Sequence, residues 1–129
     1  MTAMGAWPGG ITAITLFVED LAEAKRFYQA VFDLPTQFED ENSAVFGLGN
    51  TMINLLDAKS APELVDPAPV GTREGARAVY TLTVDDVDAT YARLTGLGVE
   101  FLNGPLDRPW GIRTASFRDP GGHVWEIAH

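Results

Sequence analysis

The sequence predicts an α+β fold in which two tandem βαβββ modules form a curved, mixed sheet cup. One observation is the order of the elements, because the same succession of strand, helix and three strands is predicted for residues 11–56 and for residues 77–128. A second is an internal repeat: ITLFVEDLAEA aligns with YTLTVDDVDAT, so that Thr15 falls on Thr81 and Asp20 on Asp86. Self-similarity over a whole supersecondary unit indicates duplication, with each half burying its helix on its own sheet.

The composition is that of a single globular domain of 129 residues, with 46% apolar and 21% charged residues. No apolar run reaches the length of a membrane span and the start has no signal-peptide pattern, so we expect a cytoplasmic protein. The lack of cysteine excludes disulfides, thiolate nucleophiles and zinc–cysteine sites. A net charge of −9 disfavours nucleic acid as a partner.

The first module begins with residues 11–18, an apolar and β-branched run of strand length. Asp20 then has the position of a helix N-cap, with Glu23 at the spacing of a capping box, and apolar residues recur at helical intervals up to Phe32. Pro35 marks the end of this region, because the residue before proline resists the α conformation. Three further strands are predicted at residues 36–39, 43–48 and 51–56.

Residues 57–76 are predicted to be a linker without elements of its own, because they combine prolines, small residues and charges without a sustained period. A loop of this length is either a flap beside a ligand site or a plain crossover between the modules, and we favour the crossover. The second module follows, with a helix that Asp86 caps and Gly96 ends. Its strands are predicted at residues 78–84, 99–102, 112–117 and 123–128.

The last two strands form a hairpin around the turn DPGG, which fixes their register. In the final strand Trp125 and Ile127 share the face expected to meet the core, and Glu126 lies on the other face. A carboxylate in an otherwise apolar strand either reaches solvent, meets a buried partner or faces a cavity that holds a ligand or a metal. Asp119 is expected to organise its own turn.

Several motifs resemble those of the vicinal oxygen chelate superfamily, which includes glyoxalase I, bleomycin resistance proteins and extradiol dioxygenases. They are the two V-x-D helix starts at Val18 and Val84, the helix end FYQAVFDL and, most specifically, FRDPGGHVWEI. The resemblance covers residues 11–128 and implies one domain over residues 1–129, with module one at 11–56, a linker at 57–76 and module two at 77–128. It also implies a homodimer, because small two-module members usually pair.

In metal-dependent members of this superfamily, four ligands come from the first and the last strand of each module. By position, the resemblance places these sites at Ala13, Asn54, Val79 and Glu126, of which only Glu126 is a good ligand. The two histidines are not obvious substitutes, since one lies on the opposite face from Glu126 and the other ends the chain. We therefore expect no metal and no other cofactor.

Without a metal, the cup becomes an apolar basin with a few polar groups, which is the general character of a small-molecule site. Trp110 is favoured to stack on a planar ligand, and Arg113 to pair with a ligand carboxylate or with Glu126. Each wall residue also has a purely structural alternative, as part of the core or as a solvated charge. The predicted floor contains Ala13, Thr15, Asn54, Val79, Thr81 and Glu126, and the predicted wall contains Phe46, Met52, Trp110 and Arg113.

Two functions from different classes fit this cup. The first is binding and sequestration of a small hydrophobic or aromatic molecule, as the resemblance to bleomycin resistance proteins implies, and we favour it because the cup offers no second titratable group. The second is a metal-independent lyase or isomerase in which Glu126 is the general base for a proton beside a carbonyl, with Asn54 or Arg113 stabilising the enolate. A glyoxalase I-like or dioxygenase-like metal enzyme is a third alternative.

Overall fold

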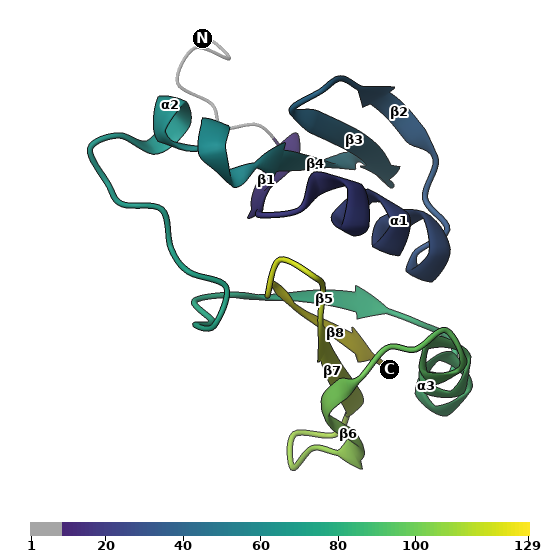
Figure 1. The fold of residues 1–129 in the computed structure, drawn as a ribbon. Helices are drawn as coiled ribbons and strands as arrows, with labels where there is room; N and C mark the ends of the chain where they lie inside the picture. Colours follow the sequence, from purple (N-terminus) through teal and green to yellow (C-terminus); the bar gives the residue numbers. More distant parts are fainter. Residues whose placement is uncertain (1–8) are drawn as a thin grey trace, which may run out of the picture.

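The computed structural model describes residues 9–129, which form two four-stranded sheets of the same topology (Figure 1). The first module contains β1 (Ala13–Val18), α1 (Leu21–Val31), β2 (Thr36–Glu39), β3 (Ser43–Leu48) and β4 (Thr51–Asp57). The second contains β5 (Val79–Thr83), α3 (Val87–Gly96), β6 (Phe101–Asp107), β7 (Arg113–Arg118) and β8 (Val124–Ala128). The strand orders are β1-β4-β3-β2 and β5-β8-β7-β6, with one parallel pair in each sheet. The predicted α+β class with mixed, curved sheets is confirmed.

Both long helices begin at the predicted caps. The Asp20 carboxylate accepts the backbone N–H of Glu23 at 3.0 Å, and the Asp86 carboxylate accepts that of Ala89 at 3.0 Å. Each cap satisfies one of the N–H groups that a first helical turn leaves without a partner. No helix within residues 9–129 is long and apolar enough to cross a bilayer.

The segment between the modules was predicted to lack elements, and this prediction is wrong. It contains a 3₁₀ turn, η1 (Ala58–Ser60), and one short helix, α2 (Pro62–Val65). Asp57 caps the first by accepting the N–H of Lys59, and Pro62 occupies the first helical turn, where its missing N–H costs nothing. Elements this short have no measurable periodicity, so composition alone could not indicate them.

Strand β6 is longer than the predicted 99–102, because it continues through Gly104 and Pro105. A proline is tolerated here since β6 is the edge strand of its sheet. Gly104 has φ +85°, and a Cβ at this position would meet the backbone of Thr114 on β7. The register of β6 with β7 shifts between Asn103 and Leu106, so the ladder is irregular at this close approach.

The core lies between the two sheets and is continuous across both modules. Figure 1 shows α1 beneath the first sheet and above β5, so that this helix separates the sheets. The Tyr28 ring stacks on Phe46 at 5.8 Å and meets Trp125 edge-on at 6.2 Å between ring centroids. The inward-facing residues of the two sheets are Leu16, Val18, Ala44, Phe46, Ile53 and Leu55, and Ala115, Phe117, Trp125 and Ile127.

A buried hydrogen-bond chain joins the modules inside this core. The Tyr28 hydroxyl donates to Asp119 Oδ2 at 2.6 Å, and the Trp125 indole N–H donates to the Tyr28 oxygen at 3.1 Å. Burial, and after it the charge of Asp119, raises the pKa of Tyr28 well above its usual value of about 10. The phenol therefore stays protonated as a donor at neutral pH, and its contribution to stability is lost only as the pH rises beyond the usual tyrosine range.

We expect Tyr28→Phe to lower the free energy of unfolding by about 1 to 3 kcal/mol, because it leaves a buried carboxylate and a buried indole without their shared partner. Urea unfolding at neutral pH measures this change. Tyr91→Phe is the matched control, since the Tyr91 ring packs on Phe101 but its hydroxyl has no hydrogen bond to another residue of the described chain. Equal stability losses in the two variants would contradict this role for Tyr28.

Candidate functional site

The first group of candidate residues lies on the outer face of the first sheet, opposite the core. In the parallel register of β1 with β4, Thr15 lies beside Asn54 and Ala13 beside Met52. The Asn54 amide nitrogen is 3.4 Å from the Thr15 hydroxyl, whereas Asn54 Oδ1 is buried and has no partner within residues 9–129. A buried acceptor without a donor costs about 1 to 3 kcal/mol, so this oxygen is ready to receive a hydrogen bond from a ligand or a water molecule.

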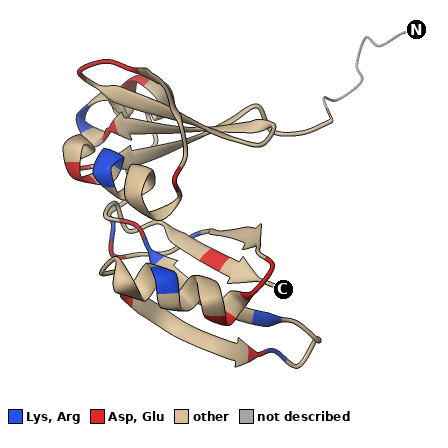
Figure 2. Cartoon of the chain, turned by 90° about the vertical axis from the view of Figure 1, so that its right-hand side faces the viewer, with Lys and Arg blue, Asp and Glu red and all other residues tan. Residues whose placement is uncertain are grey.

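The second group lies on the outer face of the second sheet. Thr81 on β5 is in register with Glu126 on β8, and its hydroxyl donates to Glu126 Oε1 at 2.8 Å. Val79 lies two residues along β5 on the same face and is 53% exposed. Figure 2 shows acidic positions, drawn red, in both modules, and Glu126 is the acidic residue of β8. The carboxylate is therefore oriented by a hydroxyl on the outer face of the second sheet.

Sequence reasoning missed Ser116, which is the partner of Glu126 in the antiparallel register of β7 and β8. Directly opposite residues on one face of a sheet have their Cβ atoms about 5 Å apart, so Ser116 belongs to the same polar group as Glu126 and Thr81. Its side chain is almost fully buried. The alternation of faces along β7 indicates which residues share a side with Ser116. Its pairing with Glu126, however, can be found only when the register of the hairpin is known residue by residue.

Arg113 does not belong to this face, which corrects its predicted role. It alternates with Ala115 and Phe117 on the opposite side of β7, and its guanidinium pairs with Asp88 on α3 and Asp107 on β6, each at 3.0 Å. Hydrogen bonds to Asp88 and Asp107 raise the pKa of Arg113. The bond between Arg113 and Asp88 also lowers the pKa of Asp88. Arg113 fastens α3 to the edge of the sheet and is not available to Glu126 or to a ligand on the outer face.

The remaining predicted wall residues lie in three different environments. Phe46 is fully buried in the core against Tyr28, so its assignment to the cup is also corrected. Met52 is half-buried on the outer face, beside Ala13. Trp110 is 68% exposed in the turn between β6 and β7, where the guanidinium of Arg108 lies 5.9 Å from its ring centroid. Met52 thus lies on the face of Asn54, and Trp110 lies on a projecting turn.

One chain does not bring the two groups together. The inner faces of both sheets meet at the shared core, so the outer faces, with Asn54 on one and Glu126 on the other, point away from each other. β1 and β5 are edge strands, and each carries part of a candidate group along its open edge. Each module therefore carries one of the two candidate groups.

The residues at the family's metal positions do not fit a metal ion. A family-type site needs three or four protein donors, and the side chains of Ala13 and Val79 have none. Asn54 offers one neutral amide oxygen, and Glu126 is held by Thr81. Within residues 9–129, no group of three or more His, Cys, Asp or Glu side chains is arranged to hold a metal.

The two tandem βαβββ modules, with the same strand order in each sheet, make the chain a small, duplicated α+β protein. A sequence model of the Glyoxalase/Bleomycin resistance protein/Dioxygenase superfamily matches residues 10–127. The chain belongs to this superfamily, which confirms the resemblance found in its motifs.

Individual relatives span most of the chain. It is 36% identical over 119 residues to the uncharacterized protein YraH of Bacillus subtilis, covering 88% of this chain and 93% of that protein. It is 29% identical over 127 residues to the metallothiol transferase FosB of Shouchella clausii, covering 92% and 78%. A glyoxalase-related enzyme from Fulvimarina pelagi superposes with a TM-score of 0.82 at 26% identity, covering 94% and 88%. A lactoylglutathione lyase from Agrobacterium tumefaciens superposes with a TM-score of 0.76 at 25% identity, covering 94% and 93%.

We expect the purified protein to contain well under one equivalent of nickel, zinc, iron or manganese per chain by elemental analysis, because two of the four family positions are hydrocarbon. The double substitution Ala13→His and Val79→His is the matched control, since it supplies two imidazoles at those positions and should raise nickel or zinc uptake. A stoichiometric metal in the wild type that disappears in Glu126→Gln would contradict the expectation.

Proposed function

We propose that two copies of the chain form a cup that binds a small hydrophobic or aromatic molecule without the family metal, and that the protein acts by sequestering it. The observations that carry the proposal are an unsatisfied acceptor, Asn54 Oδ1, on the outer face of the first sheet and an oriented carboxylate, Glu126, on the outer face of the second. An apolar basin with a few placed polar groups is suited to an organic ligand. Cytoplasmic location stays a prediction.

The open edges of both sheets support assembly of two copies. An edge strand presents unpaired backbone N–H and C=O groups, and β1 and β5 are such strands. Apolar side chains accompany them, since Ile11 is 64% exposed just before β1 and Val79 is exposed at the start of β5. In a two-fold dimer the same pair of edges meets twice, so β1 of one copy beside β5 of the other would form two equal cups.

Such a dimer would bring the two candidate groups together. Asn54 and Thr15 from one copy would face Glu126 and Thr81 from the other, with Val79 and its apolar counterparts forming the floor. The ligand would then meet one acceptor at each side and hydrocarbon between them. This arrangement favours a flat molecule that has a hydroxyl or amino group at its rim.

One observation favours a catalytic alternative. Thr81 holds Glu126 at 2.8 Å, and a carboxylate fixed in this way is suited to take a proton from a carbon beside a carbonyl group. The protein would then be a metal-independent lyase or isomerase, with Glu126 as its base and the Asn54 amide close to the developing enolate. The relatives whose names indicate a lyase or a transferase belong to the same superfamily, but the metal positions of this chain differ from a metal-binding set.

We expect light scattering at micromolar concentration to give about twice the chain mass of 14.0 kDa. Val79→Lys places a charge at the proposed junction of β5 and should shift the mass toward the monomer. Leu97→Lys is the control, because Leu97 is an exposed apolar residue at the end of α3, away from both edges, and its substitution should leave the dimer intact. A wild-type monomer under these conditions would remove the composite cup.

Calorimetric titration with 1-naphthol, a neutral aromatic alcohol, tests the role of Glu126. If the carboxylate accepts the hydroxyl, Glu126→Gln should weaken binding by about 1 to 3 kcal/mol, whereas Glu63→Gln on the exposed helix α2 should change nothing. If Glu126 is a general base, turnover of a carbonyl substrate should fall about a hundredfold in Glu126→Gln while affinity stays the same. Unchanged affinity together with unchanged turnover would exclude both roles.

A further inference from the structure

A second hollow, separate from the proposed cup, lies where the linker crosses from one module to the other. Its volume is about 210 Å³, and neither Asn54 nor Glu126 lines it. The end of β1, the linker before β5 and the turn between β7 and β8 form its walls. The lining residues that matter for its chemistry are Glu19, Arg73, Arg77, Gly121 and His123.

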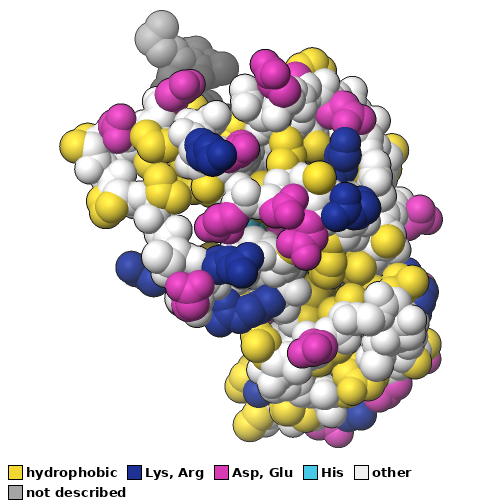
Figure 3. Space-filling model, in the orientation of Figure 1, with side chains coloured by type: hydrophobic (Ala, Val, Ile, Leu, Met, Phe, Trp, Pro, Cys, Tyr) yellow, Lys and Arg dark blue, Asp and Glu magenta, His cyan; other side chains and the backbone are white. Residues whose placement is uncertain are grey.

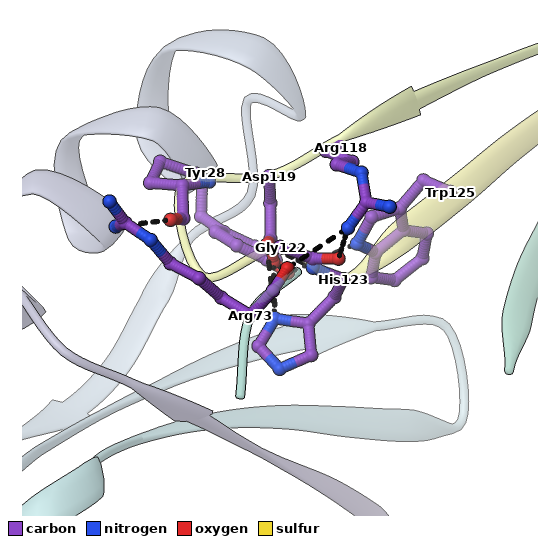
Figure 4. Close-up of polar contacts among 8 residues, drawn as sticks. Tyr28, Arg73, Arg118, Asp119, Gly122, His123 and Trp125 are labelled. Atoms are coloured by element: carbon purple, nitrogen blue, oxygen red, sulfur yellow. Dashed lines mark hydrogen bonds and ion pairs between the residues drawn. The ribbon is translucent and has the colours of Figure 1, made fainter. Parts of the chain in front are cut away.

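The linker wall of this pocket is fastened in place. The Arg118 guanidinium donates to the carbonyl oxygens of Arg73 and Gly122, both at 3.0 Å, and of Glu74 at 3.2 Å. Gly122 has φ +89°, and a Cβ there would collide with the backbone of Arg73, so the two backbones can approach only because this residue is glycine. Figure 4 shows Arg118 and Arg73 meeting at the turn. The hollow is therefore built by specific contacts of the linker with the turn.

His123 is oriented by a buried carboxylate at the edge of this pocket. Its Nδ1 lies 3.0 Å from both oxygens of Asp119, whose side chain is fully buried. Asp119 also accepts the Tyr28 hydroxyl at 2.6 Å and the backbone N–H of His123 at 2.8 Å. Because a carboxylate is an acceptor, the tautomer that fits this contact carries its proton on Nδ1, and in that tautomer Nε2 is an acceptor.

The second ring nitrogen of His123 is available. Figure 4 shows it on the side of the ring away from Asp119. Within residues 9–129, Nε2 has no hydrogen-bond partner. Solvent can reach this atom, and the side chain is 21% exposed. The turn itself is already closed by the backbone N–H groups of His123 and Gly122, which donate to Asp119. The orientation of the imidazole is thus an additional feature beyond what the turn requires.

The charge around the pocket is opposite in sign to that of the protein. Arg73 and Arg77 line it together with one acidic residue, Glu19, although the whole chain carries a net charge of −9. Figure 3 shows basic side chains gathered over the end of the linker, beside acidic ones. Arg77 has no ion pair with another residue of the described chain. A local excess of guanidinium groups in an acidic protein favours an anionic ligand.

We infer that this pocket binds a small organic acid with a hydroxyl group next to its carboxylate. The hydroxyl donates to His123 Nε2, and the carboxylate pairs with the guanidinium of Arg77. The volume of about 210 Å³ suits a molecule of this small size, because pockets for larger, drug-sized molecules measure about 300 to 1,000 Å³. The site is independent of the proposed cup, so either could exist without the other.

Titration with glycolate, the smallest 2-hydroxy acid, tests the site by NMR of the histidine rings. The chain has only two histidines, and His129 lies at the C-terminus with its Nδ1 against the carbonyl of Asp85, so His129→Gln assigns both signals. Glycolate at constant pH should shift the Nε2 resonance of His123 saturably at millimolar concentration and leave His129 unchanged. Acetate, which lacks the hydroxyl, should bind about fivefold more weakly.

Two variants separate binding from folding. Arg77→Gln alters an exposed side chain and keeps the contacts of Asp119, and it should weaken glycolate about tenfold with an unchanged thermal midpoint. His123→Gln loses the ring signal, so its binding is followed by the backbone amide signals of Gly121 and Gly122, which line the pocket, and it should abolish the difference between glycolate and acetate. Equal shifts of both histidines, no saturable shift, or an Arg77→Gln variant that binds glycolate as the wild type does would each overturn the inference.

Discussion

The hydrogen bond from Tyr28 to Asp119 is the interaction on which the arrangement of the molecule depends. It connects the helix of the first module to the last turn of the second, inside a core where an unpaired carboxylate would be costly. With Trp125 added as a donor, it fixes how α1 packs against the second sheet. The inner faces of both sheets are thereby used for the core, and the candidate residues Asn54 and Glu126 lie on the outer faces.

This division separates the residues that stabilise the fold from the residues at the family's metal positions. The residues that stabilise the chain point inward, whereas Ala13, Asn54, Val79 and Glu126 point outward and contribute little to the core. Hydrocarbon side chains at Ala13 and Val79 on the outer faces are therefore compatible with the fold, in agreement with the separation of fold from function. What remains on those faces is an acceptor on one sheet and an oriented carboxylate on the other.

Local signals made most of the fold predictable, and long-range contacts were the part that could not be predicted. The caps at Asp20 and Asp86 and the period of two in β8 depend on neighbours in sequence, and they were read correctly. Phe46 and Arg113 were misplaced because the face that a strand residue occupies depends on register with distant strands. The contact of Tyr28 with Asp119, and the orphan oxygen of Asn54, arise only once the modules have packed.

We propose that the two candidate groups converge between two chains and not within one. Since the protein has no cysteine, single nitroxide labels can be placed at Ala13→Cys and at Val79→Cys, on side chains that the structure leaves exposed. Electron paramagnetic resonance on a mixture of the two labelled proteins, corrected for each protein alone, should give a short distance. A doubly labelled chain diluted with unlabelled protein should give a long one. A short distance within the diluted chain, or none in the mixture, would contradict the account.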